Sequence, residues 1–192
     1  EILRCLVGSE MCIRDRFMIF IDTSGAAVLS LIACILHEGG HLLAMAVCGA
    51  NPERITFYGG GIALSKSGME SLTDAKRLVI LSAGCSVNLL VAAACFAMQG
   101  NDTAAVFGAV NLIICIFNAL PIGYFDGAEV LELLLTGFVS LRTAEKVKKI
   151  VGTVLALIIT AGVIVYCVMC GESVSLSLFF VVLFLIQAQL VS

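Results

Sequence analysis

Two histidines and a glutamate in the segment HEGGH, residues 37–41, are the residues of this sequence best suited to chemistry. Residues four apart share one face of a helix, so His37 and His41 can hold a single Zn²⁺ through their imidazoles. Zinc lowers the pKa of a bound water to about 7, and a nearby carboxylate can remove a proton from that water and later deliver it to a leaving amine. The spacing therefore predicts metal-assisted hydrolysis, with His37 and His41 as ligands and Glu38 as the general base.

The surroundings of this motif strengthen the prediction. His37 and His41 are the only histidines in the chain, and they lie with Glu38 inside an otherwise apolar stretch. Ionisable groups are costly in such a setting and usually mark function. The alternative is a structural role, in which the two histidines are satisfied core residues and Glu38 extends its charge to the membrane surface.

A catalytic zinc usually has three protein ligands, so a third ligand must come from another segment. Asp126 is the leading candidate, because it is the only acidic residue between Asp102 and Glu129 and follows a break in the helical pattern. Gly127 would allow the backbone to approach closely there. Asp126 could also be the N-cap of a helix that begins near Ala128, and taken alone it fits both roles.

The elements that position these residues must be membrane helices. Of 192 residues, 60% are hydrophobic and 13% are charged, and the mean hydropathy is +1.10, which exceeds what a water-soluble domain of this length needs for its core. A net charge of -3 without a basic stripe argues against nucleic-acid binding. We expect an all-α polytopic membrane protein in contact with the lipid bilayer, and the number of hydrophobic stretches long enough to cross a membrane excludes a soluble zinc protease.

Five hydrophobic stretches have lengths compatible with crossing a hydrocarbon core of about 30 Å, at about 1.5 Å rise per residue. Residues 17–21 resemble the end of a sixth span, and residues 71–74 are expected to cap the second. An irregular segment at 121–127 precedes a short helix at 128–135, and such backbone must lie against protein or a water-filled cavity. The five predicted spans are 24–48, 75–98, 103–119, 148–170 and 174–191.

The segment 51–65, between the first two spans, differs in character. Its β-branched and aromatic residues flank Gly59, Gly60 and Gly61, which predicts a short glycine-rich β-hairpin. An exposed hairpin edge can accept an extended peptide as an added strand. The three glycines are therefore candidate substrate-binding residues, although a plain surface turn fits the sequence equally well.

Basic residues are concentrated in two of the connections between predicted spans, whereas the connections around Asp102 and Glu172 contain no lysine or arginine. By the positive-inside rule, the first and third connections are cytoplasmic. This topology brings HEGGH and Asp126 to the same, cytoplasmic side. The basic residues are Arg54, Lys66, Lys76 and Arg77 after the first span, and Arg142, Lys146, Lys148 and Lys149 after the third.

The chain is expected to hold one functional domain. Residues 1–16 resemble the translation of a sequencing adapter and are treated as non-native. Residues 17–192 are expected to form a single membrane-embedded domain. Within it, residues 24–135 form the catalytic core and residues 136–192 form C-terminal helices.

Four short elements, in this order, resemble the site-2 protease family of intramembrane metallopeptidases, peptidase family M50. HEGGH resembles the zinc helix of that family, and residues 57–61 its glycine hairpin. Residues 82–88 resemble an Ala-Gly-Pro-x-x-Asn element, with Cys85 in place of the proline. Residues 118–127 resemble the Asn-x-x-Pro…Asp-Gly ligand motif, with Phe125 in place of a leucine. The likeness is greatest to the compact bacterial branch typified by stage IV sporulation protein FB.

The resemblance implies an intramembrane zinc metalloendopeptidase of the bacterial plasma membrane, with Asp126 as the third ligand and Asn118 holding the substrate backbone. Its substrates would be single-span or membrane-tethered proteins, such as a membrane-tethered transcription factor. Gly84 and Asn88 are expected to serve close helix packing and an interhelical hydrogen bond. The alternatives are a zinc-binding membrane protein or transporter without protease activity, and a non-catalytic relative that acts as a membrane chaperone.

Overall fold

The computed structural model describes residues 25–50, 55–58, 61–64, 72–98 and 100–170. Predictions for residues 1–16, for 17–21, for the span at 174–191 and for Gly59 and Gly60 lie outside these ranges. The chain forms two compact units, residues 1–116 and residues 117–192.

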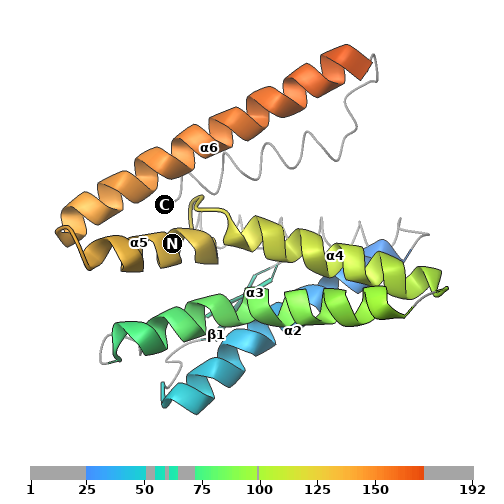
Figure 1. Cartoon of the computed structure of the whole chain (residues 1–192), viewed down its shortest axis with the longest axis horizontal. Coiled ribbons are helices and arrows are strands. Elements are labelled where there is room, and N and C mark those ends of the chain that lie inside the picture. Colours follow the sequence, from blue (N-terminus) through green and yellow to red (C-terminus); the bar gives the residue numbers. More distant parts are fainter. Residues whose placement is uncertain (1–24, 51–54, 59–60, 65–71, 99, 171–192) are drawn as a thin grey trace, which may run out of the picture. The chain divides into compact units, whose positions relative to one another are not determined.

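The first unit is built mainly from α2 (Ala26–Cys48), α3 (Asp74–Ala97) and most of α4 (Asp102–Ala119) (Figure 1). Within the described ranges, three helices are long and apolar enough to cross a membrane, at Val28–Cys48, Asp74–Ala97 and Asp102–Ala119. The first three predicted spans are therefore confirmed as helices of that length and composition, with ends that differ by only a few residues.

Local hydrogen bonds explain where these helices end. Gly49 adopts a left-handed conformation with φ of 78°, and Ala50 donates its backbone N–H to the Met45 carbonyl at 2.9 Å, which closes α2 as helices ending in glycine commonly do. Asn101 accepts a hydrogen bond from the Ala104 N–H at 3.0 Å and so caps the start of α4. At the start of α3, Thr73 occupies the N-cap position without a side-chain cap bond, so the capping predicted for this residue is not formed. Ser71 lies outside the described residues.

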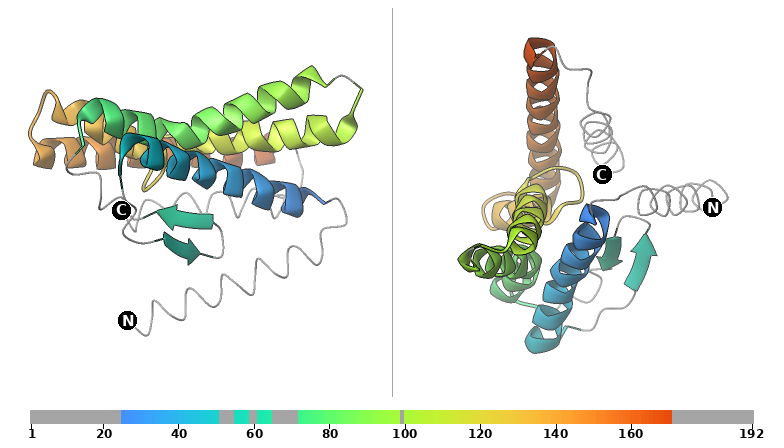
Figure 2. Two further views of the ribbon diagram at one scale, coloured as in Figure 1. Left: turned by 90° about the horizontal axis from the view of Figure 1, so that it is seen from below. Right: turned by 90° about the vertical axis from the view of Figure 1, so that its right-hand side faces the viewer.

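Small residues let the three helices pack closely. A Cβ on Gly40 of α2 would lie 2.9 Å from the Ala83 carbonyl oxygen of α3, so the two backbones approach at this point. α3 and α4 run antiparallel side by side (Figures 1 and 2), and the Cys85 thiol donates to the Cys115 carbonyl across them at 3.7 Å.

A two-stranded antiparallel sheet follows α2. Strand β1 (Ile55–Tyr58) pairs with β2 (Gly61–Leu64), with Ile55 opposite Leu64 and Tyr58 opposite Gly61 (Figure 2). β2 lies against α2, the helix that carries HEGGH. Gly61 is the first residue of β2.

The second unit contains α5 (Asp126–Thr136) and α6 (Leu141–Cys170). The irregular segment before α5 is shorter than predicted, because the helix begins at Asp126 and not at Ala128. This segment is held by an apolar cluster in which Ile122 and Phe125 pack with Ala156 of α6. The fourth predicted span lies within α6, which begins seven residues earlier than expected.

An ion-pair network joins α5 to α6. Lys148 of α6 pairs with Glu132 and with Glu129 at 3.8 Å, both on α5. The three side chains are 19–35% exposed, so the network is partly shielded from solvent. It fixes the register of α6 against the helix that begins with Asp126.

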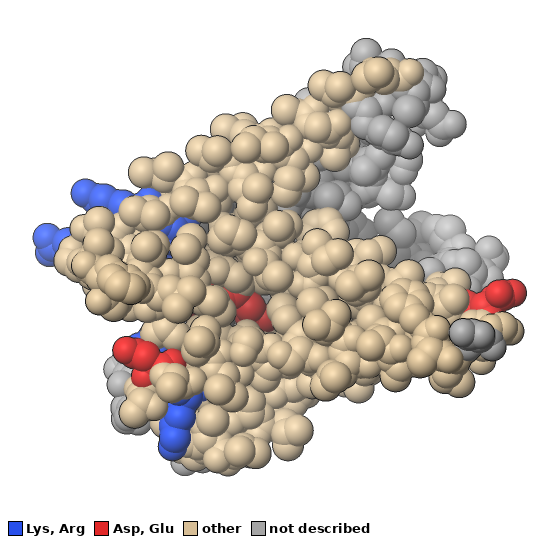
Figure 3. Space-filling view, in the orientation of Figure 1, with Lys and Arg blue, Asp and Glu red and all other residues tan. Residues whose placement is uncertain are grey.

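The described surface is mainly apolar. On the face shown in Figure 3, acidic and basic side chains are few and most of the surface carries neither. Large apolar side chains are exposed on several helices, among them Leu43 at 65%, Leu90 at 71% and Phe138 at 89%. Such extensive apolar exposure fits contact with lipid.

Candidate metal centre

α2 presents His37 and His41 one helical turn apart on its buried face. Their side chains are 3% and 6% exposed, and their Nε2 atoms lie 3.3 Å apart. Two nitrogens bound to one tetrahedral zinc at about 2.0–2.1 Å would be separated by about 3.3–3.4 Å. The two imidazoles are therefore already spaced as a pair of zinc ligands.

A backbone carbonyl of α3 sets the tautomer of His41. The His41 Nδ1 atom lies 2.7 Å from the carbonyl oxygen of Ile80. A carbonyl oxygen can only accept, so Nδ1 carries the proton, and a neutral ring in this tautomer has its lone pair at Nε2. Hydrogen bonds of this kind orient metal-binding histidines in many proteins.

Gly84 of α3 makes room for the imidazole pair. A Cβ at this position would lie 2.4 Å from His41 Nε2 and 2.8 Å from His37 Nε2. Only a residue without a side chain allows both rings to occupy this space. The expectation that Gly84 serves close helix packing is confirmed, and the group it packs against is the ligand pair itself.

Asp126 is the first residue of α5, and it is 8% exposed. Phe125 takes the N-cap position without a side-chain cap bond, so the capping role considered for Asp126 is not the one observed. Gly127 allows the close backbone approach expected of it, because a Cβ there would lie 2.1 Å from the Ala119 carbonyl oxygen. The helix N-terminus also favours the charged carboxylate.

The three predicted ligands come together. His37, His41 and Asp126 each offer a ligand atom, these atoms lie within 4.8 Å of one another, and all three residues are buried. Two nitrogens and one carboxylate oxygen form a donor set that suits zinc and leaves a fourth position for water or substrate. A divalent cation would also neutralise the carboxylate in a buried setting, where charge without a partner is costly.

The remaining candidate residues lie near these elements in the chain. Glu38 is half-buried on α2 beside His37 in sequence, and Asn118 is half-buried in the last turn of α4. Tyr124, two residues before Asp126, is exposed over about half of its surface, and the burial of the rest raises the pKa of its phenol above the ordinary value.

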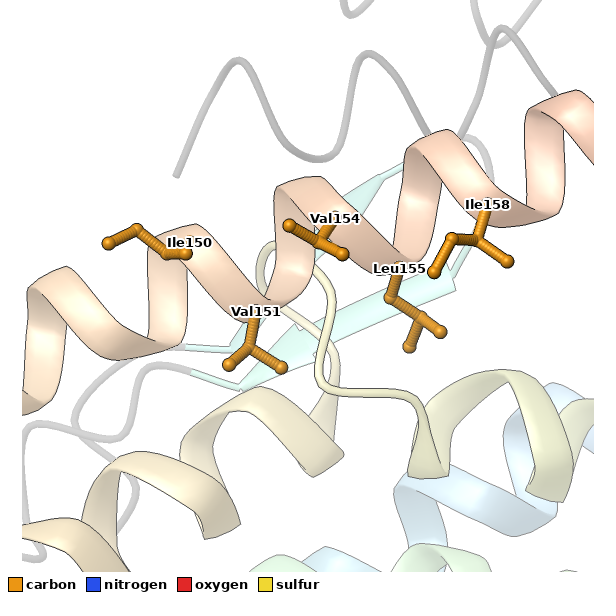
Figure 4. Close-up of a pocket in the computed structure, with 5 residues that line it drawn as sticks. All are labelled: Ile150, Val151, Val154, Leu155 and Ile158. Carbon is orange, nitrogen blue, oxygen red and sulfur yellow. The ribbon is translucent and has the colours of Figure 1, made fainter.

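An apolar pocket of about 280 Å³ lies along α6, lined by Ile150, Val151, Val154, Leu155 and Ile158 (Figure 4). Its lining has no group that could bind a metal or transfer a proton. The candidate chemistry therefore belongs to the His37, His41 and Asp126 group.

The chain is similar to known proteins in sequence and in fold. The model of Peptidase family M50 matches residues 100–162, a stretch that contains Asp126 and Asn118 but not HEGGH. The solved structure of a site-2 protease from Methanocaldococcus jannaschii matches with a TM-score of 0.67 and 19% sequence identity, over 96% of this chain and 86% of that chain. The fold is that of a site-2 protease. None of the curated proteins matches the sequence.

The site-2 protease fold and the family match support each other because they rest on different observations. The family match covers Asn118 and Asp126 of the predicted site. HEGGH lies outside the matched residues and is predicted as a metal-binding motif from its own spacing. The closer likeness to the bacterial sporulation branch stays a prediction.

Proposed function

We propose that this chain is a zinc-dependent intramembrane metalloprotease, which hydrolyses peptide bonds in or near the transmembrane segments of other membrane proteins. The observation that supports this most directly is the convergence of His37, His41 and Asp126, with their ligand atoms within 4.8 Å of one another. The site-2 protease fold and the M50 match agree with this assignment.

In the proposed site, His37 Nε2, His41 Nε2 and an Asp126 carboxylate oxygen would hold the zinc. When bound, zinc supplies Lewis acidity, which makes a water more acidic and polarises a peptide carbonyl. Glu38 takes a proton from the attacking water as its oxygen bonds to the carbonyl carbon. Glu38 then returns that proton to the amide nitrogen as the carbon–nitrogen bond breaks.

The substrate in this proposal is a single-span or membrane-tethered protein. A helical peptide bond is shielded by its own hydrogen bonds, so the substrate must become extended before it is cut. The β1–β2 hairpin, which contains Gly61, could receive an extended substrate segment as an added strand. Asn118 could hold the substrate backbone through its amide.

We further propose that the protein lies in a bacterial plasma membrane with its site toward the cytoplasm. The support is the distribution of basic residues. Lys76 and Arg77 lie in the first turn of α3, and Arg142 lies at the start of α6. Basic groups therefore lie at helix ends that the positive-inside rule assigns to the cytoplasmic side of the membrane.

The decisive experiment combines metal analysis with cleavage of a membrane peptide by purified protein. The unmodified chain should bind one zinc and cleave, and a chelator should abolish cleavage until zinc is restored. Glu38→Gln should retain zinc but lose cleavage, because only the proton carrier is removed. Asp126→Asn should lose most of the zinc, since it removes a charged ligand.

Two exposed acidic residues provide matched controls. Glu145→Gln on α6 and Asp102→Asn at the start of α4 make the same chemical changes away from the site, and both should leave zinc content and cleavage unchanged. Stoichiometric zinc in the unmodified chain without any hydrolysis would reject the protease and favour a zinc carrier. Full zinc content in Asp126→Asn would reject the ligand set.

A further inference from the structure

Two asparagines are fully buried in the apolar helices of the first unit. Asn88 of α3 and Asn111 of α4 are both 0% exposed. Within the described part of the chain, neither side-chain polar atom of Asn88 has a hydrogen-bond partner, and the same holds for Asn111 Oδ1. The interhelical hydrogen bond expected of Asn88 is therefore not formed directly. Unsatisfied amide groups at membrane depth cost several kcal/mol in general, so a partner is required.

Helix geometry places Asn88 where α2, α3 and α4 meet. Around α3, Asn88 lies about 40° from Gly84, which faces the imidazoles of α2, and about 60° from Cys85, which faces α4, at about 100° per residue. It therefore points between these two neighbours. The Cβ positions of residues four apart on a helix are about 5–6 Å apart. Asn88 therefore lies one turn along α3 from Gly84, whose position faces the nitrogens of His37 and His41.

Asn111 approaches the same place from α4. α3 and α4 are antiparallel, with Cys85 bonded to the Cys115 carbonyl and a Cβ on Gly108 only 3.0 Å from Cys95. Position 111 falls between these two contacts, within about one helical turn of Asn88 along the helix pair. Gly108 and Asn111 are the buried residues of α4, and they lie one turn apart on the face toward α3.

The unsatisfied atoms match the capacity of one water molecule. Asn111 Nδ2 already donates to the Phe107 carbonyl at 2.9 Å, which leaves three side-chain atoms without a partner, namely Asn88 Nδ2 and the Oδ1 atoms of both residues. The two amides do not bond to each other directly, because Asn88 Nδ2 and both Oδ1 atoms have no hydrogen-bond partner within the described residues. A water accepts one hydrogen bond and donates two, so it can satisfy all three atoms.

We propose that Asn88 and Asn111 hold an internal water between α3 and α4, and that this water replenishes the one consumed at the metal centre. The second half of the proposal rests on the proposed function, because it assumes hydrolysis. Asn88 acts here through water and is a positioning residue. The ligand is water itself, which an enzyme working below the lipid surface must obtain from a polar site.

The test is a crystal structure of the zinc-loaded full chain in lipid, at a resolution that shows ordered waters, joined to kinetics of Asn88→Leu and Asn111→Leu. The unmodified chain should show a water within hydrogen-bond distance of both amides. Asn88→Leu should lose this water, keep zinc and KM, and have a lower kcat. Asn88→Ser, whose hydroxyl can still bind water, should recover part of the loss. Ser86→Ala, which removes a hydroxyl from an exposed position of the same helix, should have no effect.

The outcomes separate the two parts. The absence of a water between the two amides of the unmodified protein would overturn the site, whether or not the leucine variants fold. A water present there, with an unchanged kcat in both leucine variants, would overturn the replenishing role. An unmodified protein that binds zinc and shows the water but never hydrolyses a peptide would defeat the proposed function and the replenishing role, and would leave the water site established.

Discussion

Replacing Gly84 by alanine tests the metal centre without touching a ligand. The new Cβ would lie 2.4 Å from His41 Nε2 and 2.7–2.8 Å from two atoms of the His37 ring. Atoms in ordinary contact are 3.4 Å or more apart. His41 Nε2 would therefore have to retreat by about 1 Å, or α3 would have to move away from α2 by a similar distance.

The expected effect follows from the tolerance of metal coordination. Ligand distances in zinc sites hold to within about 0.2 Å, so a displacement of about 1 Å removes an effective ligand. If α3 moves instead, the Ile80 carbonyl withdraws from His41 Nδ1 and the ring loses its fixed orientation. Loss of such a supporting hydrogen bond alone lowers affinity by about 10–100-fold. We expect the combined change to weaken zinc binding by about 100-fold or more, equivalent to about 2.8 kcal/mol.

Zinc affinity is measured by competition with a chelator of known strength, and folding by thermal unfolding of the metal-free protein. Gly162→Ala on α6 is the matched control, because a Cβ there meets nothing within 4 Å. Gly162→Ala should bind zinc normally. A folded Gly84→Ala protein with unaltered zinc affinity would refute the inference that α3 positions the imidazoles.

Three further changes probe the second unit and the substrate. Gly127→Ala would place a Cβ 2.1 Å from the Ala119 carbonyl oxygen, so it should displace the start of α5 and lower both thermal stability and zinc content; a normal zinc content would contradict this. Lys148→Met would leave Glu129 and Glu132 partly buried without their cation, which should cost about 1–3 kcal/mol in chemical unfolding. Adding Glu132→Gln to Lys148→Met should recover part of that cost, and simple additivity would argue against the network. In a cleavage assay, replacing helix-weakening residues near the cut of a substrate by leucine should slow hydrolysis, and an unchanged rate would contradict the need for unwinding.

The membrane helices were predictable from the sequence because their signals are local. The apolar stretches around HEGGH and after Thr73 and Asp102 determine α2, α3 and α4 almost to the residue. His37 and His41 could also be predicted as a ligand pair, because spacing along a single helix fixes which side chains share a face. The start of α5 was misplaced by two residues because turn-forming residues, such as Gly123 and Gly127, predict irregular backbone for the whole segment.

The groups that position the ligands were harder to predict. The Ile80 carbonyl sets the His41 tautomer, but every residue has a carbonyl and the identity of the side chain carries no signal. In the sequence, Lys148 is one of the basic residues that assign the third connection to the cytoplasmic side. In the structure it forms an ion pair with Glu132 between α5 and α6. Pairings of this kind depend on the register between helices, which the sequence of either helix does not specify.

α3 illustrates why ligand motifs alone do not define such a centre. This helix contributes no metal ligand, yet along one buried face it offers the Ile80 carbonyl, the missing side chain of Gly84 and the amide of Asn88. Each addresses a different requirement, namely the tautomer of a ligand, the space for both rings and a polar group for the proposed water. Because these requirements are met at successive turns of one helix, a small rotation of α3 would disturb all three together. The precision of the proposed metal centre therefore depends on the packing of α2 against α3, to which Gly40 contributes where those backbones meet.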